Sequence, residues 1–380
     1  MTARLLPPAQ YIDTDDGLRE LVDVLSRESL LGIDTESNSL YAYREQICLF
    51  QISTREHDYI VDPFAIADMT PLGALLADPT IEKVFHAAEY DIMCLKRDYG
   101  FEVRHLFDTM IAARVLGYEA IGLGSLLEQH FDVTVNKRHQ RDNWGKRPLP
   151  QDSLRYAQVD THYLPQLYDI IRAELEANQQ LVEAREIFED VLCVPAANNE
   201  FDPEGYWRIA IPRQLAPRQV AILRELYLLR ENLAERRDCP PFKIFGDQVM
   251  VTLSQRLPRN KRQLAKIKGI SHGQIGRYGS QILRAIRRGL KAHPPSPPPP
   301  QPPAAPDVVE RYMALHDWRK DRARKRGVES DVVLAKSTLW RLAEEAPATL
   351  DEIAVVQGIG PWRLEHYGEE ILRILKRHAS

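Results

Sequence analysis

The sequence predicts an α/β domain over residues 1–210, followed by two all-α helical-bundle modules at 211–292 and 307–380. Short apolar runs alternate with helical patterns in the first segment, whereas only helical periodicity remains beyond Pro217. A proline-rich linker at 293–306 separates the modules, because such a stretch continues neither a helix nor a central strand. A chain of 380 residues is long enough for two or three domains, each with its own core.

The elements of the first domain follow from apolar runs bounded by turn signals. The predicted strands span 30–34, 47–52, 59–61 and 81–86. After the last strand we expect a helix containing 91–95, and later one long helical stretch from about 152 to 177. In the first module, residues 221–236 carry apolar side chains at three- and four-residue spacing, which is typical of an amphipathic helix.

The two helical modules repeat one pattern. Ile267-Lys268-Gly269-Ile270 with Tyr278-Gly279 recurs as Val356-Gln357-Gly358-Ile359 with Tyr367-Gly368. A repeat of about 75 residues predicts two units of the same fold. The linker between them favours extended polyproline II, a semi-rigid spacer, and the alternative is a proline-rich ligand for a recognition module.

Charge is divided unevenly along the chain, although the net charge is only -4. Residues 1–210 hold 19 basic and 36 acidic side chains, residues 211–293 hold 18 and 5, and residues 307–380 hold 13 of each. The basic middle segment would attract phosphates through counterion release, which predicts a polyanionic partner. The alternative is that these side chains only solvate a helical module.

Composition narrows the class of protein. The hydrophobic fraction of 44% and the charged fraction of 27% are typical of a soluble globular protein. Cys48, Cys94, Cys193 and Cys239 lie far apart without the spacing of a zinc site or a disulfide framework, so we expect reduced thiols. Neither a signal-type segment nor a run of about 18 apolar residues occurs, which predicts a cytoplasmic protein with no membrane partner. A coiled-coil seam is also missing, and we expect a monomer.

Two carboxylates stand at the end of the strand at 30–34. Asp34 and Glu36 are two positions apart, so in a strand their side chains project from the same face. Mg²⁺ and Mn²⁺ prefer oxygen ligands of this kind and would offset the repulsion between them. Taken alone, such a pair is more often a solvated strand end.

Further acidic residues follow in order. Asp91 lies near the start of the helix after the fourth strand, and Asp160 follows Tyr156 by four residues, so phenol and carboxylate share one helical face. Taken singly, Asp91 is equally explained by the helix macrodipole. Tyr156 and Asp160 are equally explained by a core tyrosine beside an exposed acid.

Together these motifs resemble those of the DEDD exonucleases of the ribonuclease H-like fold, in the tyrosine-containing subgroup. The matching stretches are Gly32-Ile33-Asp34-Thr35-Glu36, His86-Ala87-Ala88-Glu89-Tyr90-Asp91 and Tyr156-Ala157-Gln158-Val159-Asp160. Phe107-Asp108-Thr109 and residues 144–149 are similar to the ribonuclease D family. In that family an exonuclease domain precedes two HRDC modules (helicase and ribonuclease D C-terminal), which here resemble residues 211–292 and 307–380.

The resemblance implies a 3′→5′ exoribonuclease that uses two divalent metal ions, Mg²⁺ or Mn²⁺, and releases nucleoside 5′-monophosphates. Asp34, Glu36 and Asp160 would hold the metal that activates water. Asp34 would bridge to a second ion, which Asp91 would support through water. Tyr156 would position the attacking water. The resemblance further implies trimming of tRNA precursors and other small structured RNAs.

Basic residues are the expected RNA contacts. Near the cleft these are Lys137, Arg138, Arg141, Lys146 and Arg147, around Trp144, which either stacks a base or belongs to the core. In the first module they are Arg256, Arg259, Lys261, Arg262, Lys266 and Lys268. The turns at 269–270 and 358–360 resemble helix-hairpin-helix turns, whose N–H groups can meet a phosphate. His86 is either a core residue or a substrate contact, and Asp108 is expected to be structural.

Two other functions remain compatible with the sequence. A DNA 3′→5′ exonuclease would have the same site and differ in sugar recognition. A catalytically silent RNA-binding scaffold is disfavoured because an acidic cluster without its metal costs stability. The neutral second module is expected either to bind RNA or to serve packing or a protein partner.

Overall fold

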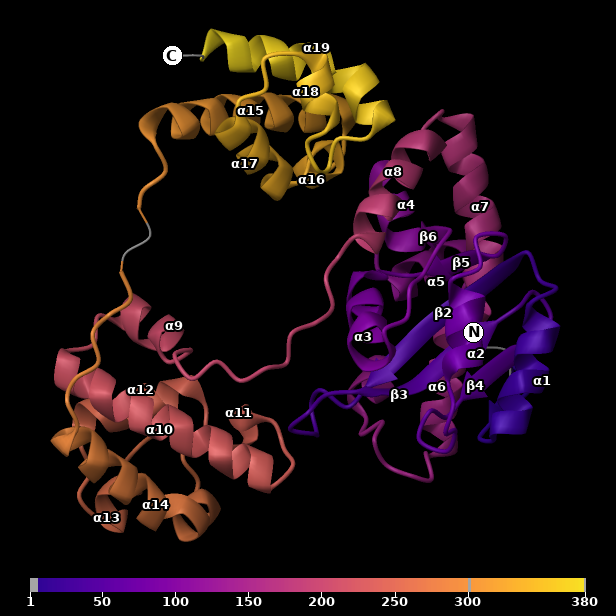
Figure 1. Cartoon of the computed structure of the whole chain (residues 1–380). Helices are drawn as coiled ribbons and strands as arrows, with labels where there is room; N and C mark the ends of the chain where they lie inside the picture. The colour runs from indigo at the N-terminus through magenta and orange to yellow at the C-terminus, as the bar shows by residue number, and fades with distance from the viewer. Residues whose placement is uncertain (1–5, 300–301, 379–380) are drawn as a thin grey trace. The chain divides into compact units, whose positions relative to one another are not determined.

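The computed structural model describes residues 6–299 and 302–378 and divides the chain into two compact units. The first unit comprises residues 1–36, 47–197 and 302–380, and the second comprises residues 37–46 and 198–301. The α/β domain and the second helical module therefore belong to one unit, and the first module forms most of the other. Figure 1 labels the elements of both units.

A mixed six-stranded sheet is the centre of the α/β domain. Its strands are β1 Gln10–Ile12, β2 Leu30–Ser37, β3 Ile47–Ser53, β4 Asp58–Val61, β5 Glu82–Phe85 and β6 Leu106–Asp108. They lie in the order β1-β4-β3-β2-β5-β6, with β3 and β4 antiparallel and the pairs β1–β4, β2–β5 and β5–β6 parallel. The four predicted strands are confirmed, and the two additional strands have only three residues each.

Helices cover both faces of this sheet. They are α1 Asp15–Leu25, α2 Thr70–Leu76, α3 Glu89–Tyr99, α4 Thr109–Val115, α5 Leu123–Phe131, η1 Lys137–Arg141, α6 Gln151–His162, α7 Leu164–Ala177 and α8 Leu181–Leu192. Successive side chains of β3 point to opposite faces. The Phe50 ring contacts Tyr99 of α3 at 5.7 Å between centroids, whereas Ser53 Oγ lies 2.7 Å from Thr161 Oγ1 of α6. The α/β fold class is therefore confirmed.

The helical stretch expected from about 152 to 177 is confirmed, but the structure divides it into two helices. α6 ends at His162, and α7 begins at Leu164 with Pro165 in its first turn. Proline has no N–H, so Pro165 cannot donate to Thr161 O, and its ring would clash with that carbonyl in a continuous helix. A Cβ atom added to Gly32 of β2 would lie 3.0 Å from Leu164 Cβ and from Thr161 O. β2 therefore approaches this break closely, and a larger residue at position 32 would require its neighbours to give way by a few tenths of an ångström.

The two helical modules share one plan, so the predicted repeat is confirmed. In the second unit α9 Trp207–Ala210 and η2 Ile211–Arg213 precede the first module, which contains α10 Pro217–Arg236, α11 Pro241–Ile244, α12 Asp247–Arg256, α13 Lys261–Leu264 and α14 His272–Lys291. The second module contains α15 Pro306–Arg326, α16 Ser330–Val333, α17 Lys336–Glu345, α18 Leu350–Ala354 and α19 Pro361–Arg377. Gly269 and Gly358 occupy equivalent turns and share a φ of 91°. The buried Arg230 donates to the carbonyl of Phe245, and the equivalent Arg319 donates to the carbonyl of Leu334.

The linker expected at 293–306 has neither helix nor strand in its described residues before α15, which begins at Pro306. Pro300 and Gln301 lie outside the described residues. Among the helices that the structure describes, none is long and apolar enough to cross a membrane.

Candidate active site

β2 presents two carboxylates on one face of the sheet. Its first half, Leu30 to Ile33, is buried, and its last four residues are partly exposed. Gly32 faces α6 and α7, so the alternation of a strand directs Asp34 and Glu36 to that same face. The sheet thus fixes one half of the site, and the helix opposite provides the rest.

α6 contributes Tyr156 and Asp160, which are one helical turn apart. The Tyr156 hydroxyl lies close enough to the Asp160 carboxylate for each group to shift the pKa of the other. Single ligand oxygens of Asp34, Glu36 and Asp160 all lie within 4.8 Å of one another. An all-carboxylate oxygen set of this size fits a hard divalent cation such as Mg²⁺ or Mn²⁺.

Asp91 occupies a separate position beside this trio. It lies buried in the first turn of α3 and accepts a hydrogen bond from Thr35 Oγ1. Thr35 stands between Asp34 and Glu36, so its side chain leaves the opposite face of β2. The middle residue of the Asp-x-Glu motif therefore anchors the fourth carboxylate. Sequence reasoning missed this role, for which a hydroxyl between two acids was the signal.

The four carboxyl groups of the site have raised pKa values, so they retain protons more readily when no cation is bound. Burial, and then the charges of Asp91 and Asp160, raise the pKa of Asp34 well above its usual range, and burial followed by Asp160 does the same to Glu36. Burial likewise raises the pKa values of Asp91 and Asp160 to about 7. Because protons and a cation compete for these oxygens, metal binding would displace protons.

Tyr156 is protonated at neutral pH. Burial raises the pKa of its phenol, and the charges of Asp160 and Glu36 raise it further. The hydroxyl is therefore a hydrogen-bond donor and not a phenolate ligand. This state agrees with the expectation that Tyr156 orients water.

Asp108 organises the turn that leads to Asp91. This fully buried carboxylate caps α4 by accepting from Met110 N at 2.9 Å and Ile111 N at 3.1 Å. It also accepts from Ala87 N at 3.1 Å and Ala88 N at 2.7 Å, in the turn between β5 and α3. Ala87 is held in the left-handed region with a φ of 65°. These four hydrogen bonds support the structural role expected of Asp108.

His86 belongs to the same buried network. Its Nδ1 lies 2.9 Å from Thr109 Oγ1, and Thr109 Oγ1 also donates to Phe85 O at 3.0 Å. Burial lowers the pKa of His86 to about 4, so the ring is neutral under ordinary conditions. These contacts favour the core interpretation of His86 over a substrate contact.

Trp144 is a core residue, and the expectation that it stacks a nucleobase is wrong. Its side chain is 1% exposed and packs in a cluster with Cys48, Leu49 and Ile60. Its ring centroid lies 6.3 Å from that of Tyr156. An aromatic residue in a basic loop is typical of a base-stacking site, but tertiary packing buries this ring against Tyr156.

Arg147 makes several internal contacts, and its predicted contact with RNA stays a prediction. Its guanidinium donates to both Asp62 oxygens, at 2.5 and 2.7 Å, and to the carbonyl oxygens of Trp144 and Cys48 at 2.7 Å each. These bonds fix the segment that contains Trp144 and Arg147 beneath Tyr156. The remaining predicted contacts of this region are exposed and stay predictions: Lys137, Arg138, Arg141 and Lys146.

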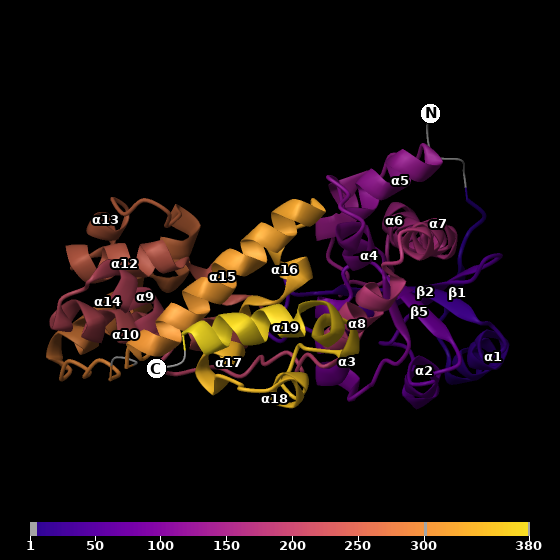
Figure 2. The ribbon, with the colours of Figure 1, turned by 90° about the horizontal axis from the view of Figure 1, so that it is seen from above.

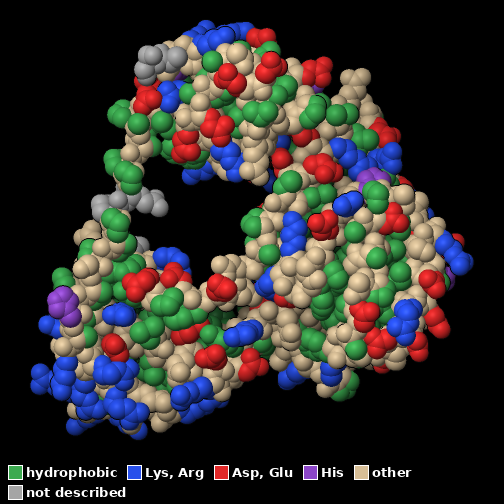
Figure 3. Space-filling model, in the orientation of Figure 1, with side chains coloured by type: hydrophobic (Ala, Val, Ile, Leu, Met, Phe, Trp, Pro, Cys, Tyr) green, Lys and Arg blue, Asp and Glu red, His purple; other side chains and the backbone are tan. Residues whose placement is uncertain are grey.

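The first module presents an exposed basic surface. Blue side chains gather over α13 and α14 in Figure 3. The predicted contacts in this part of the chain are all exposed: Arg256, Arg259, Lys261, Arg262, Lys266 and Lys268. Dense positive charge on a solvated face is compatible with phosphate binding, which stays a prediction.

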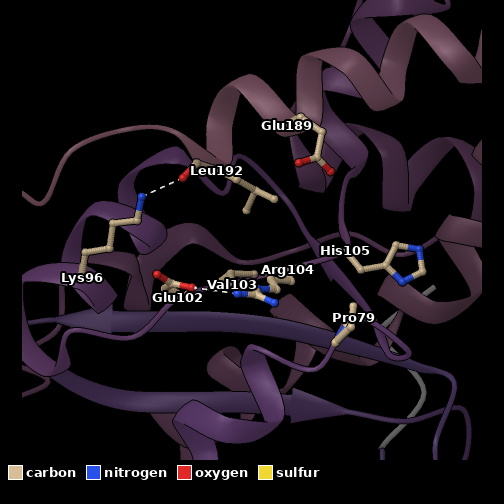
Figure 4. A pocket seen from close by; sticks show the side chains of 8 residues that line it. All are labelled: Pro79, Lys96, Glu102, Val103, Arg104, His105, Glu189 and Leu192. Atoms are coloured by element: carbon tan, nitrogen blue, oxygen red, sulfur yellow. Dashed lines mark hydrogen bonds and ion pairs between the residues drawn. The ribbon is translucent and has the colours of Figure 1, made fainter.

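A hollow on the α/β domain lies apart from this chemistry. It is lined by Pro79, Lys96, Glu102, Val103, Arg104, His105, Glu189 and Leu192 (Figure 4). The Lys96 ammonium donates to the carbonyl oxygens of Leu192 and Val194 at 2.7 Å each, so it is already engaged. Because none of the four site carboxylates lines it, we do not assign the hollow to the reaction.

Comparisons with known families agree with this geometry. Residues 9–176 match the 3′-5′ exonuclease family, and residues 219–286 and 309–375 match the HRDC domain. The predicted resemblance is therefore confirmed for the nuclease domain and for both modules.

Individual relatives extend the match. A ribonuclease D of Gluconacetobacter diazotrophicus is 32% identical over 283 residues, which cover 74% of this chain and 72% of that protein. An exosome complex component 10 homolog of Caenorhabditis elegans is 35% identical over 67% of this chain, but the match spans only 29% of that protein's length.

Solved structures give the same picture. Escherichia coli RNase D, described as an exoribonuclease involved in structured RNA processing, matches with a TM-score of 0.65 and 25% identity. That match covers 98% of this chain and 100% of the other. The likeness therefore includes the order of the nuclease domain and the two modules.

Proposed function

Because the chain belongs to the ribonuclease D family of metal-dependent 3′→5′ exoribonucleases, we propose that it hydrolyses RNA from the 3′ end and releases nucleoside 5′-monophosphates. One observation carries the proposal. Oxygens of Asp34, Glu36 and Asp160 lie within 4.8 Å of one another, and Tyr156 lies one helical turn from Asp160 on α6.

The proposed role of each site residue follows from its position. Asp34, Glu36 and Asp160 would hold one divalent cation, and Asp91, fixed by Thr35, would support a second largely through water. When bound, Mg²⁺ or Mn²⁺ would neutralise phosphate charge and make water a stronger nucleophile at neutral pH. Tyr156, held as a neutral phenol, would orient the attacking water towards phosphorus.

RNA affinity would come from basic side chains away from the carboxylates. Four exposed residues near the site and six in the first module provide positive charge without sequence selectivity. We therefore expect the acidic domain to supply the chemistry and the first module to supply most of the salt-dependent binding.

We further propose small structured RNAs, such as tRNA precursors, as substrates. The description of the Escherichia coli relative as a processor of structured RNA supports this substrate class. A monomeric protein acting in the cytoplasm is the corresponding proposal for assembly and location.

The test is to incubate 5′-labelled RNA and the matched DNA with the purified chain and Mg²⁺ or Mn²⁺. Asp34→Asn removes a ligand of the trio, and EDTA removes the cation. Asp152→Asn is the matched control, because Asp152 is an exposed acid in the first turn of α6. We expect a ladder that shortens from the 3′ end of RNA, persists in the control variant, and disappears with Asp34→Asn and with EDTA.

Other outcomes would select another function. Faster loss of DNA than of RNA would favour the DNA exonuclease. Binding of RNA without cleavage of either substrate would favour the silent scaffold. Products ending in a 3′-phosphate would contradict the two-metal mechanism, because that mechanism breaks the bond to the 3′-oxygen.

A further inference from the structure

The two HRDC modules differ at the start of their last helix. In the first module α14 is capped from within its own sequence. Ser271 Oγ accepts from Gln274 N at 3.2 Å, and Gln274 Oε1 accepts from Ser271 N at 2.7 Å. This reciprocal capping box satisfies two backbone donors that a helix start leaves unpaired.

The second module cannot form that cap. The residues equivalent to Ser271 and Gln274 are Gly360 and Arg363, which offer no side-chain acceptor. The same two backbone donors are instead satisfied by Glu186 of α8, in the nuclease domain. Glu186 accepts from Gly360 N at 3.0 Å and from Arg363 N at 3.4 Å, and also from Trp362 N at 2.8 Å.

The residues that replace the cap fit the incoming carboxylate. A Cβ atom at position 360 would lie 2.2 Å from Glu186 Cδ, so only glycine admits this approach. Arg363 is 3% exposed and donates to Asp190 Oδ2, one turn after Glu186, at 2.7 Å. The substitutions that remove the internal cap thus also build the contact with α8.

Further contacts in the same unit surround this one. Arg326 donates through two nitrogens to the two oxygens of Glu183, which is 1% exposed, each at 2.6 Å. Arg114 of α4 donates to Glu329 at 2.7 Å, and Val332 of α16 belongs to the hydrophobic core of the nuclease domain. Figure 2 shows α19 beside α8.

We propose that α8 is a docking surface for the second module, and that Glu186 fastens the module by supplying the helix cap that its own sequence lacks. The turn at 358–360, expected from the sequence to meet a phosphate, then holds an internal carboxylate. The second module is a packing module, and the first module, with its self-contained cap, is not committed in this way.

The test separates the module from its covalent tether. A specific protease site inserted between Ser296 and Pro297 allows the full chain to be nicked in the linker and analysed by gel filtration. Glu186→Ala removes the cap, whereas Glu189→Ala removes an exposed acid of the same helix that lines the hollow of Figure 4. We expect the C-terminal fragment to remain with the nuclease domain in the wild type and in Glu189→Ala, and to dissociate in Glu186→Ala.

Hydrogen exchange supplies a second readout on the intact chain. The Gly360, Trp362 and Arg363 amides should exchange about tenfold faster in Glu186→Ala, in line with the loss of a helix cap. Unchanged exchange and a fragment that stays bound would overturn the proposal.

A rescue distinguishes a cap from a nonspecific charge. Adding Gly360→Ser and Arg363→Gln to Glu186→Ala gives the second module the capping box of the first. We expect the protection of the residue 360 and 363 amides to return while the nicked fragment still dissociates. A triple variant whose amides remain unprotected, although circular dichroism shows its helices intact, would refute the capping argument.

Discussion

Replacing Asp108 with alanine tests how the fold places the fourth carboxylate. The substitution changes none of Asp34, Glu36 and Asp160 directly, since the Asp108 carboxylate accepts hydrogen bonds from four backbone N–H groups. Two of those groups start α4, and two belong to the strained turn that precedes α3. The effect should therefore fall on stability and on Asp91.

The magnitude follows from the lost acceptors. Loss of a helix N-cap costs about 1 kcal/mol. The Ala87 and Ala88 amides lie in a buried turn, and an unpaired buried donor costs about 1–3 kcal/mol. Part of this is offset, because burial raises the pKa of Asp108 and removing a desolvated carboxylate is itself favourable. We expect a net loss of about 3 kcal/mol.

Urea denaturation at equilibrium measures this loss, and hydrogen exchange of the nuclease-domain amides localises it. Asp108→Asn keeps one acceptor oxygen and should cost about half as much, whereas Asp152→Ala, an exposed acid, should change stability by less than about 0.5 kcal/mol. A loss below about 1 kcal/mol in Asp108→Ala would refute the view that its four hydrogen bonds hold the turn.

Three further outcomes are expected. Trp144→Ala should lower the free energy of unfolding in urea by about 3–5 kcal/mol and lower kcat, because Tyr156 loses its packing partner. A raised KM with unchanged kcat would instead indicate that Trp144 stacks on a nucleobase. The metal-free protein should lose thermal stability as pH rises from about 4 to about 7, because burial raises the pKa of Asp160 in the folded protein from its ordinary value of 3.8 to about 7. Calorimetry with EDTA should show this fall, and Mn²⁺ should abolish it. A rise in metal-free Tm over that window would contradict the argument. Lys261→Gln with Arg262→Gln should reduce the slope of log Kd against log salt for single-stranded RNA by about 1.4, and an unchanged slope would exclude the two side chains as phosphate contacts.

Local periodicity explains why the sequence predicted much of the site. Alternation in a strand suffices to place Asp34 and Glu36 on one face, and a four-residue step in a helix suffices to pair Tyr156 with Asp160. Neither rule depends on the rest of the fold. The meeting of the strand with the helix came from the family resemblance, because no local pattern reports a contact across 120 residues.

Sequence reasoning fell short where tertiary packing decides. Trp144 has the surroundings of an exposed residue in sequence, and only the cluster beneath Tyr156 makes it a core side chain. Arg147 pairs with Asp62, 85 positions away, which local pattern cannot reveal. The break at Tyr163 could have been predicted, since Pro165 lies two residues later, but the apolar spacing on both sides concealed it.

Gly32 shows that a residue without a side chain can influence the separation between the strand and the helix that carry the site carboxylates. Its absent Cβ would meet the Leu164 Cβ and a backbone oxygen of Thr161, and neither atom can swing aside as the tip of a long side chain could. A larger residue at this position would push β2 and the α6–α7 break apart. The neighbours would have to give way by a few tenths of an ångström, and Asp160, one position before Thr161, lies on the helix that would have to move.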